Sequence, residues 1–304
     1  MKDAKLVLKQ EGSRNTKIRI GSSTIGGNEL FIVGGPCSIE SLEQMEQVAI
    51  ALSHGPVQAI RGGAFKPRTS PYSFQGLGIE GLKILSEINQ RFNVPVITEL
   101  MTESQIPDIV QHADVLQIGS RNMQNFDLLK AVGTAGKPVI LKRGLAATLE
   151  EFILAAEYIM AHGNPNVILC ERGIRSFDTF TRNVLDLGAV VALKQLTHLP
   201  VLVDPSHAAG KSELIADLAK AAVACGADGL MIECHPQPKK SVSDARQALS
   251  LEQMLDLIES LRLIALAVGR NIPSVKEHRS AELPPLMIGQ TDFPAMLQVA
   301  DLIA

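Results

Sequence analysis

Long apolar runs, an excess of charge of one sign and paired cysteines are all missing from this sequence of 304 residues. No run approaches the roughly 20 apolar residues of a membrane-spanning helix, and the N-terminus lacks the apolar core of an export signal. A formal net charge of −3 gives no field that would attract nucleic acid or an anionic membrane surface. The four cysteines have no paired spacing. These absences predict a cytoplasmic protein with free thiols and with no nucleic-acid or membrane partner.

The sequence does contain a pattern that repeats along most of its length. Short, almost continuously apolar runs occur at residues 31–35, 57–62, 94–99, 114–119, 137–142, 166–171, 200–204 and 228–233. Such runs are typical of strands buried on both faces of a parallel sheet. Amphipathic, helix-like segments lie between them, as at 41–53, 148–163 and 212–226. Eight strand–helix units in about 240 residues predict an α/β fold, a single (β/α)8 TIM barrel. A doubly wound open sheet is the alternative, but roughly six strands usually suffice for it.

Two segments lie outside this repeat. Residues 1–30 contain short apolar pieces that predict an N-terminal β-ribbon, which leads into the first strand and covers the bottom of the barrel. Residues 31–268 are the predicted catalytic barrel. Residues 269–304 are punctuated by proline and predict a C-terminal arm.

The stretch "RGGAFKPRTSPYSFQGLG", residues 61–78, gathers positive charge on a loop. Arg61, Lys66 and Arg68 fall within eight residues, beside the hydroxyl group of Thr69. Proline at 67 and 71 excludes an ordinary helix and stiffens the chain, so fewer backbone states are lost when a ligand binds. Because the protein as a whole is nearly neutral, these cations are expected to serve a local anion.

Cations also follow other predicted strands, at the barrel end that carries the chemistry of such folds. The six cations expected at this rim are Arg61, Lys66, Arg68, Arg121, Lys142 and Arg172. A guanidinium group pairs with phosphate and carboxylate through two parallel hydrogen bonds. Six cations are too many for one monophosphate. They predict a pair of ligands that carries two phosphates, or two phosphates and a carboxylate.

A second set of strand-end residues has the donor atoms of a metal site. It consists of Cys37, His207, Glu233 and Asp244. A thiolate, an imidazole and two carboxylates suit a divalent transition metal. Taken singly, each residue has an ordinary explanation: a small buried thiol, a capping histidine, or a carboxylate that pairs with a nearby cation. Only their expected proximity favours a metal.

The other three thiols are expected to be packing residues. Cys234 should point away from Glu233, because successive side chains of a strand alternate between its two faces. Cys170 and Cys225 are interpreted as core residues.

Seven motifs follow one another along the chain: "GPCSIES", "RGGAFKPRTSPYSFQGLG", "LQIGSRNMQNFDLL", "PVILKRG", "ILCERGIRSF", "VDPSHAAG" and "IECHPQPKKSVSDARQ". Together they resemble the motifs of 3-deoxy-D-arabino-heptulosonate 7-phosphate (DAHP) synthases. The sequence is most similar to the compact branch related to 3-deoxy-manno-octulosonate 8-phosphate synthases. The segment "KPRTS" separates the two, since the octulosonate enzymes usually carry an Asn-Arg-Ser-type segment there.

The resemblance implies a metal-dependent condensation of phosphoenolpyruvate with erythrose 4-phosphate and water, the first step of the shikimate pathway. The implied phosphoenolpyruvate-binding residues are Arg61, Lys66, Glu99, Ser120, Arg121, Lys142 and Arg172. Among them, Arg121 and Arg172 are expected to bind the phosphate group. Arg68 and Thr69 are expected to bind the phosphate of erythrose 4-phosphate.

The resemblance also implies that Cys37, His207, Glu233 and Asp244 bind a divalent ion, Mn²⁺ or similar. Three of these, Cys37, His207 and Asp244, are expected to be catalytic together with Lys66. Either Lys66 or a metal-bound water near Asp244 would transfer protons, and the sequence leaves both open. The family further implies a homo-oligomer, a dimer or a tetramer.

The sequence departs from the family pattern in two places. Ala245 replaces a common glycine and is preceded by Lys239 and Lys240, so this loop is expected to lie differently. The segments outside the barrel are too short for a separate regulatory domain, so no feedback control by such a domain is expected.

Three alternative functions stay open at this point. One is another phosphoenolpyruvate–sugar condensing enzyme, such as the octulosonate synthase. Another is a Schiff-base aldolase with Lys142 as its nucleophile. The third is an inactive barrel that binds a sugar phosphate as a sensor or as an interaction subunit, although such a relative usually loses a metal ligand.

Overall fold

The computed structural model describes residues 3–53 and 55–273, and eight of its strands close a parallel barrel. The barrel strands are β3 (Phe31–Gly35), β4 (Ala59–Arg61), β5 (Val96–Leu100), β6 (Val115–Ile118), β7 (Val139–Lys142), β8 (Val167–Glu171), β9 (Val201–Val203) and β10 (Gly229–Glu233). Each strand pairs with the next one along the chain, and β10 pairs with β3. Every predicted apolar run overlaps one of these strands, so the predicted barrel is confirmed.

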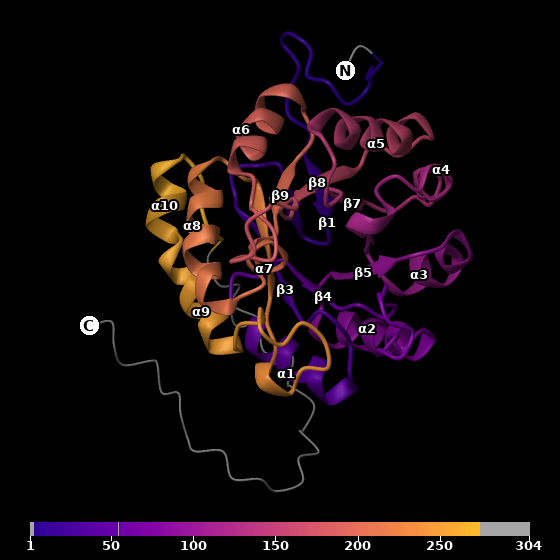
Figure 1. Cartoon of the computed structure of the whole chain (residues 1–304), viewed down its shortest axis with the longest axis vertical. Helices are drawn as coiled ribbons and strands as arrows, with labels where there is room; N and C mark the ends of the chain where they lie inside the picture. Colours follow the sequence, from indigo (N-terminus) through magenta and orange to yellow (C-terminus); the bar gives the residue numbers. More distant parts are fainter. Residues whose placement is uncertain (1–2, 54, 274–304) are drawn as a thin grey trace, which may run out of the picture.

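The helices surround the strands (Figure 1). They are α1 (Leu42–Ser53), α2 (Ile79–Phe92), α3 (Ile106–His112), α4 (Phe126–Gly133), α5 (Leu149–Ala161), α6 (Leu187–Leu196), α7 (Pro205–Ala209), α8 (Ile215–Ala224), α9 (Leu251–Ser260) and α10 (Arg262–Ala267). The last two, α9 and α10, are separated by Leu261 alone. Within the described ranges, no helix has the length and apolar character needed to cross a membrane.

Capping interactions explain where several helices begin. The hydroxyl group of Thr148 accepts a hydrogen bond from the backbone N–H of Glu151, whose carboxylate accepts one from the N–H of Thr148. Ser250 and Gln253 form the same reciprocal pair at the start of α9. Each pair satisfies backbone donors that would have no partner inside the helix.

The predicted N-terminal ribbon is confirmed as two antiparallel strands, β1 (Ile18–Ile20) and β2 (Ser23–Ile25). Ile18, Ile20 and Ile25 are buried in one cluster with inward-facing residues of the barrel strands, such as Phe31 and Ile97. The ribbon therefore closes the barrel at the end where the strands begin. The preceding segment continues along the outside, where the carboxylate of Glu157 in α5 accepts backbone hydrogen bonds from residues 5–7.

The predicted C-terminal arm falls mostly on residues 274–304, which lie outside the described residues. Its first part pairs with the N-terminal segment, since Leu30 N–H donates to the Asn271 carbonyl and Asn271 N–H donates to the Asn28 carbonyl.

Gly35, the last residue of β3, lies where the barrel has no room for a side chain. Its φ of 137° is one that other residues rarely adopt, and a Cβ there would lie 2.2 Å from the Arg61 carbonyl oxygen. Gly35→Ala should therefore lower the free energy of unfolding by about 1–3 kcal/mol. Gly27→Ala is the control, because an added Cβ there meets no atom within 4 Å. Urea unfolding of both variants measures the difference, and equal stabilities would refute the role of Gly35.

Candidate functional site

A cavity of about 510 Å³ opens at the C-terminal ends of the barrel strands. The predicted site residues on its surface are Cys37, Arg61, Lys66, Arg68, Thr69, Glu99, Ser120, Arg121, Lys142, Arg172, His207 and Asp244. Glu233 is the one predicted residue that does not line it. Its side chain is buried at the end of β10, beneath the cavity wall, where it approaches the cavity residues Arg61 and His207.

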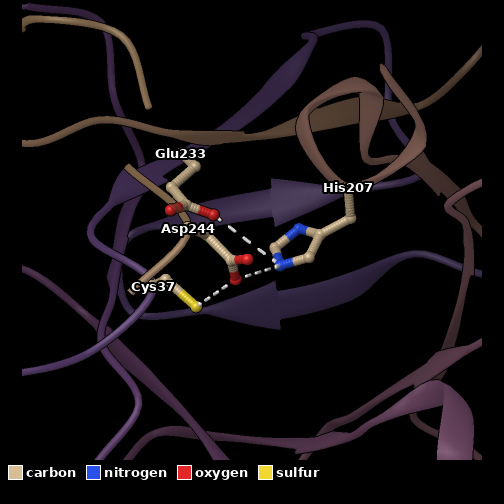
Figure 2. A group of neighbouring side chains, drawn as sticks. All are labelled: Cys37, His207, Glu233 and Asp244. Atoms are coloured by element: carbon tan, nitrogen blue, oxygen red, sulfur yellow. Dashed lines mark hydrogen bonds and ion pairs between the residues drawn. The ribbon is translucent and has the colours of Figure 1, made fainter. Parts of the chain in front are cut away.

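The four predicted metal-binding side chains meet at one side of this cavity. One donor atom from each of Cys37, His207, Glu233 and Asp244 lies within 4.8 Å of the others. Figure 2 shows all four pointing toward a common centre. Cys37 Sγ is 3.1 Å from Asp244 Oδ2, while His207 Nε2 is 3.7 Å from Glu233 Oε2 and 4.0 Å from Asp244 Oδ2. Residues more than 200 positions apart in the chain thus share one site.

Burial is the main influence on the protonation of these metal-type donor residues. It lowers the pKa of His207 to about 3, so the imidazole is neutral at pH 7. Burial and the nearby Asp244 charge likewise raise the pKa of Glu233 to about 7, against the opposing effect of Arg61. It also raises the pKa of the Cys37 thiol, which Lys66 opposes.

Asp204, which the sequence analysis missed, orients His207. Its carboxylate Oδ2 lies 2.8 Å from His207 Nδ1, and its Oδ1 accepts the backbone N–H of His207. With the imidazole neutral, this contact favours the proton on Nδ1 and leaves the Nε2 lone pair directed at the two carboxylates. The signal was in the sequence, because Asp204 stands three residues before His207 in "VDPSHAAG".

The donor set fits a divalent transition metal. A soft thiol, a neutral imidazole and two carboxylates combine on one side of a cavity. Glu233 Oε1 is buried and, among the described residues, makes no hydrogen bond. A buried oxygen without a partner costs free energy, and a metal ion would supply that partner.

The six predicted cations also line the cavity. Arg61, Lys66, Lys142 and Arg172 are each at most 5% exposed. Lys66 Nζ donates to the Cys37 carbonyl oxygen at 2.8 Å and lies 3.1 Å from Cys37 Sγ. Lys142 Nζ is 2.5 Å from Asp204 Oδ2. Asp204 therefore contacts the cationic part of the cavity as well as the metal-type donors.

In the charged loop after β4, a backbone carbonyl of the loop fixes the side chain of Arg68. Arg68 Nε donates to the Phe74 carbonyl at 2.9 Å, while Nη2 is buried and has no hydrogen-bond partner within the described ranges. The backbone N–H of Lys66 donates to the Gln75 carbonyl, which closes the loop. The loop therefore presents a fixed guanidinium to the cavity.

Glu99 and Ser120 lie on adjacent parts of the cavity wall. Glu99 Oε2 accepts a hydrogen bond from Gln117 Nε2. The Glu99 carboxylate lies so close to Gly119 that a Cβ there would be 2.0 Å from it. The absence of a side chain at 119 therefore leaves space for Glu99 just before Ser120.

Further residues of the cavity were not predicted, and some strand-end charges have other roles. Arg175, Arg182, Asn183 and Gln117 also line the wall. The first three come from the long β8–α6 connection, where Arg175 lies in the motif "ILCERGIRSF", while Arg182 and Asn183 lie beyond it. In contrast, Glu171 is buried in an ion pair with Arg143.

The remaining thiols agree with their expected packing roles, except that one is less buried. Cys170 and Cys234 are fully buried, and burial raises the pKa of each to about 12. Cys225 is only half-buried and packs at the edge of the core. The loop with the departures at Lys239, Lys240 and Ala245 still brings Asp244 to the metal-type donors.

Comparison with known proteins identifies two groups of relatives. The sequence model of the DAHP synthetase I family matches residues 9–264. Phospho-2-dehydro-3-deoxyheptonate aldolase of Thermotoga maritima is 46% identical over 269 residues, which are 88% of this chain and 80% of that protein. 2-Dehydro-3-deoxyphosphooctonate aldolase of Syntrophobacter fumaroxidans is 32% identical over 256 residues, which are 78% of this chain and 88% of that protein.

Solved structures agree with the first group. The crystal structure of the Thermotoga maritima phospho-2-dehydro-3-deoxyheptonate aldolase (DAHP synthase) has a TM-score of 0.86 at 45% identity, and the match covers 89% of this chain and 79% of that one. A truncated form of the 3-deoxy-D-arabino-heptulosonate 7-phosphate synthase from the same organism has a TM-score of 0.82. The match covers 88% of this chain and 98% of that one.

The central position of Asp204 yields a stability prediction. Asp204→Asn keeps the shape of the side chain but leaves buried Lys142 without its counter-charge. The free energy of unfolding should fall by about 3 kcal/mol, as when one partner of a buried ion pair is removed. Asp127→Asn removes the same charge from an exposed pair with Lys130 and should change stability little. Urea unfolding compares the two, and an equally small loss for both would contradict the prediction.

Proposed function

The chain belongs to the DAHP synthetase I family, and from that membership we propose that it condenses phosphoenolpyruvate with erythrose 4-phosphate and water to give DAHP and phosphate. One observation carries the proposal: the cavity combines a metal-type donor set with cations enough for two phosphates and a carboxylate. The 46% identity to a phospho-2-dehydro-3-deoxyheptonate aldolase, against 32% to an octulosonate relative, supports erythrose 4-phosphate as the aldose.

The buried cations suit phosphoenolpyruvate. We assign its phosphate to Arg121 and Arg172, and its carboxylate and reacting end to Arg61, Lys66 and Lys142. Because four of these five cations are almost excluded from water, their attraction for an anion is stronger than it would be at an exposed surface. Glu99 and Ser120 complete this part of the site.

Arg68 and Thr69 suit the phosphate of the aldose. Both lie on the loop after β4, at the more open part of the cavity, and Arg68 offers a buried Nη2 that has no partner in the described chain. Fixing two reactants in one cavity converts their encounter into an effectively unimolecular step.

Cys37, His207, Glu233 and Asp244 would hold a divalent ion, Mn²⁺ or similar, which supplies Lewis-acid polarisation of an aldehyde oxygen. His207 offers Nε2 because Asp204 contacts Nδ1. The Cys37 and Glu233 side chains must lose their protons to bind the ion, since burial raises the pKa of both groups. Lys66, whose Nζ contacts Cys37, stabilises the resulting thiolate.

Proton transfer is assigned to Lys66, which lines the cavity beside the metal-type donors. Its ammonium group can donate a proton to an oxygen that gains charge during condensation. The Schiff-base alternative lacks support, because Lys142 is ion-paired with Asp204 and an ammonium group has no lone pair with which to attack a carbonyl. A cytoplasmic location and a homo-oligomeric state stay predictions from the sequence.

The reaction can be tested directly. Purified protein should form DAHP from phosphoenolpyruvate and erythrose 4-phosphate, and arabinose 5-phosphate should be a much poorer substrate. A chelator should abolish the activity and Mn²⁺ should restore it. Phosphate release together with mass spectrometry of the product measures both. A preference for arabinose 5-phosphate would make the chain an octulosonate synthase, and turnover of neither aldose would favour the inactive barrel.

The division of the cations between the substrates gives a second test. Arg68→Ala should weaken erythrose 4-phosphate more than phosphoenolpyruvate, and Arg172→Ala should do the reverse. Each lost charge-assisted contact should cost ~1.5–3 kcal/mol, roughly tenfold to a hundredfold in apparent affinity. Steady-state kinetics that vary each substrate separately measure the two effects. Equal effects on both substrates would show that the division is wrong.

A further inference from the structure

A chain of polar contacts joins the two carboxylates of the metal-type donor set. Gln247 Nε2 donates to Glu233 Oε2 at 2.9 Å. Arg182 Nη1 donates to Gln247 Oε1 at 3.0 Å and to Asp244 Oδ1 at 3.1 Å. Glu233 is thus linked to Asp244 through an amide and a guanidinium group, although neither linking side chain belongs to the donor set.

The amide of Gln247 suits both of its contacts. Its NH₂ group donates to a carboxylate while its oxygen accepts from a guanidinium, so the two neighbours fix which end of the amide faces which. Gln247 is 2% exposed, so water cannot replace either bond. An apolar side chain of the same size would leave Glu233 without this donor and Arg182 without this acceptor.

Asp244 needs such support more than the other three donor residues. It lies on the loop between β10 and α9, and its φ of 54° is in the left-handed region that few residues other than glycine adopt. The backbone N–H of Gln247 donates to the Asp244 carbonyl, so both residues belong to one turn. The position of Asp244 therefore depends on contacts that hold this turn against the barrel.

We propose that Gln247 is a positioning residue, which holds the Glu233 carboxylate directly and the Asp244 carboxylate through Arg182 in the arrangement that a divalent ion requires. This inference rests on the proposed metal site. It assigns Arg182 a place beside the donors rather than among them. Groups that orient metal ligands typically contribute tenfold to a hundredfold to metal affinity.

The test measures metal binding in the absence of substrates. Metal-free wild-type protein and Gln247→Met are titrated with Mn²⁺ and with Co²⁺, whose absorption band with a thiolate reports on Cys37. Gln247→Met should bind each ion tenfold to a hundredfold more weakly, and its Co²⁺ spectrum should be altered. Gln237→Met is the matched control, since Gln237 is exposed on the same loop, and it should bind like wild type.

Each result supports or overturns the proposal. Equal affinity of folded Gln247→Met and wild type would overturn it while leaving the metal site intact. If the wild type binds neither ion, the proposed metal site fails and the inference fails with it. If Gln247→Met does not fold, the same metal titration of Arg182→Met tests the proposal instead. Its side chain is 40% exposed, so folding should tolerate the change. Weakened metal binding supports the proposal, and unchanged binding overturns it.

Discussion

Two polar contacts of Asp204 connect the two halves of the cavity. One carboxylate with no exposed surface contacts Lys142, which faces the proposed phosphoenolpyruvate region, and His207, which faces the metal-type donors. A buried carboxylate is stable only when it is paired. Burial opposes the ionisation of Asp204, but the close contact with His207 and the charges of Lys142 and Arg61 hold its pKa well below its usual range. The arrangement of both halves therefore depends on a charge that does not itself line the cavity.

The remaining charges of the cavity are less completely paired. Arg61 Nη1 and Glu233 Oε1 are buried without a hydrogen-bond partner in the described part of the chain. Arg61 and Glu233 approach only to 3.8 Å. Such groups reduce stability in the unliganded protein, because each has lost water without gaining a full replacement. Their position at the strand ends is what a site for anions and a metal ion needs, since the field exists before the ligands arrive.

The fold and most of the site follow from local sequence features. Strands buried on both faces must be almost wholly apolar, so all eight appear in the sequence as short runs. The residues at or just beyond the end of each run lie at one rim, which is why Cys37, Arg61 and Lys142 could be placed together without a structure. Arg182 and Gln247 could not be placed, because their contact joins residues 65 positions apart on loops with no periodic pattern. The burial of Glu233 beneath the cavity, rather than on its wall, likewise depends on the packing of the β10–α9 loop.

The ribbon at the opposite end of the barrel determines how substrates can enter the cavity. Ile18, Ile20 and Ile25 fill the bottom of the barrel. Substrates, water and products must therefore enter and leave through the cavity at the C-terminal ends of the strands. The proposed phosphoenolpyruvate cations Arg61, Lys142 and Arg172 are buried, whereas Thr69 on the proposed aldose-phosphate loop is exposed. A molecule seated at the entrance would block the way to the interior. On the proposed assignment the phosphoenolpyruvate site lies deeper than the aldose-phosphate site, so the proposal implies that phosphoenolpyruvate binds first.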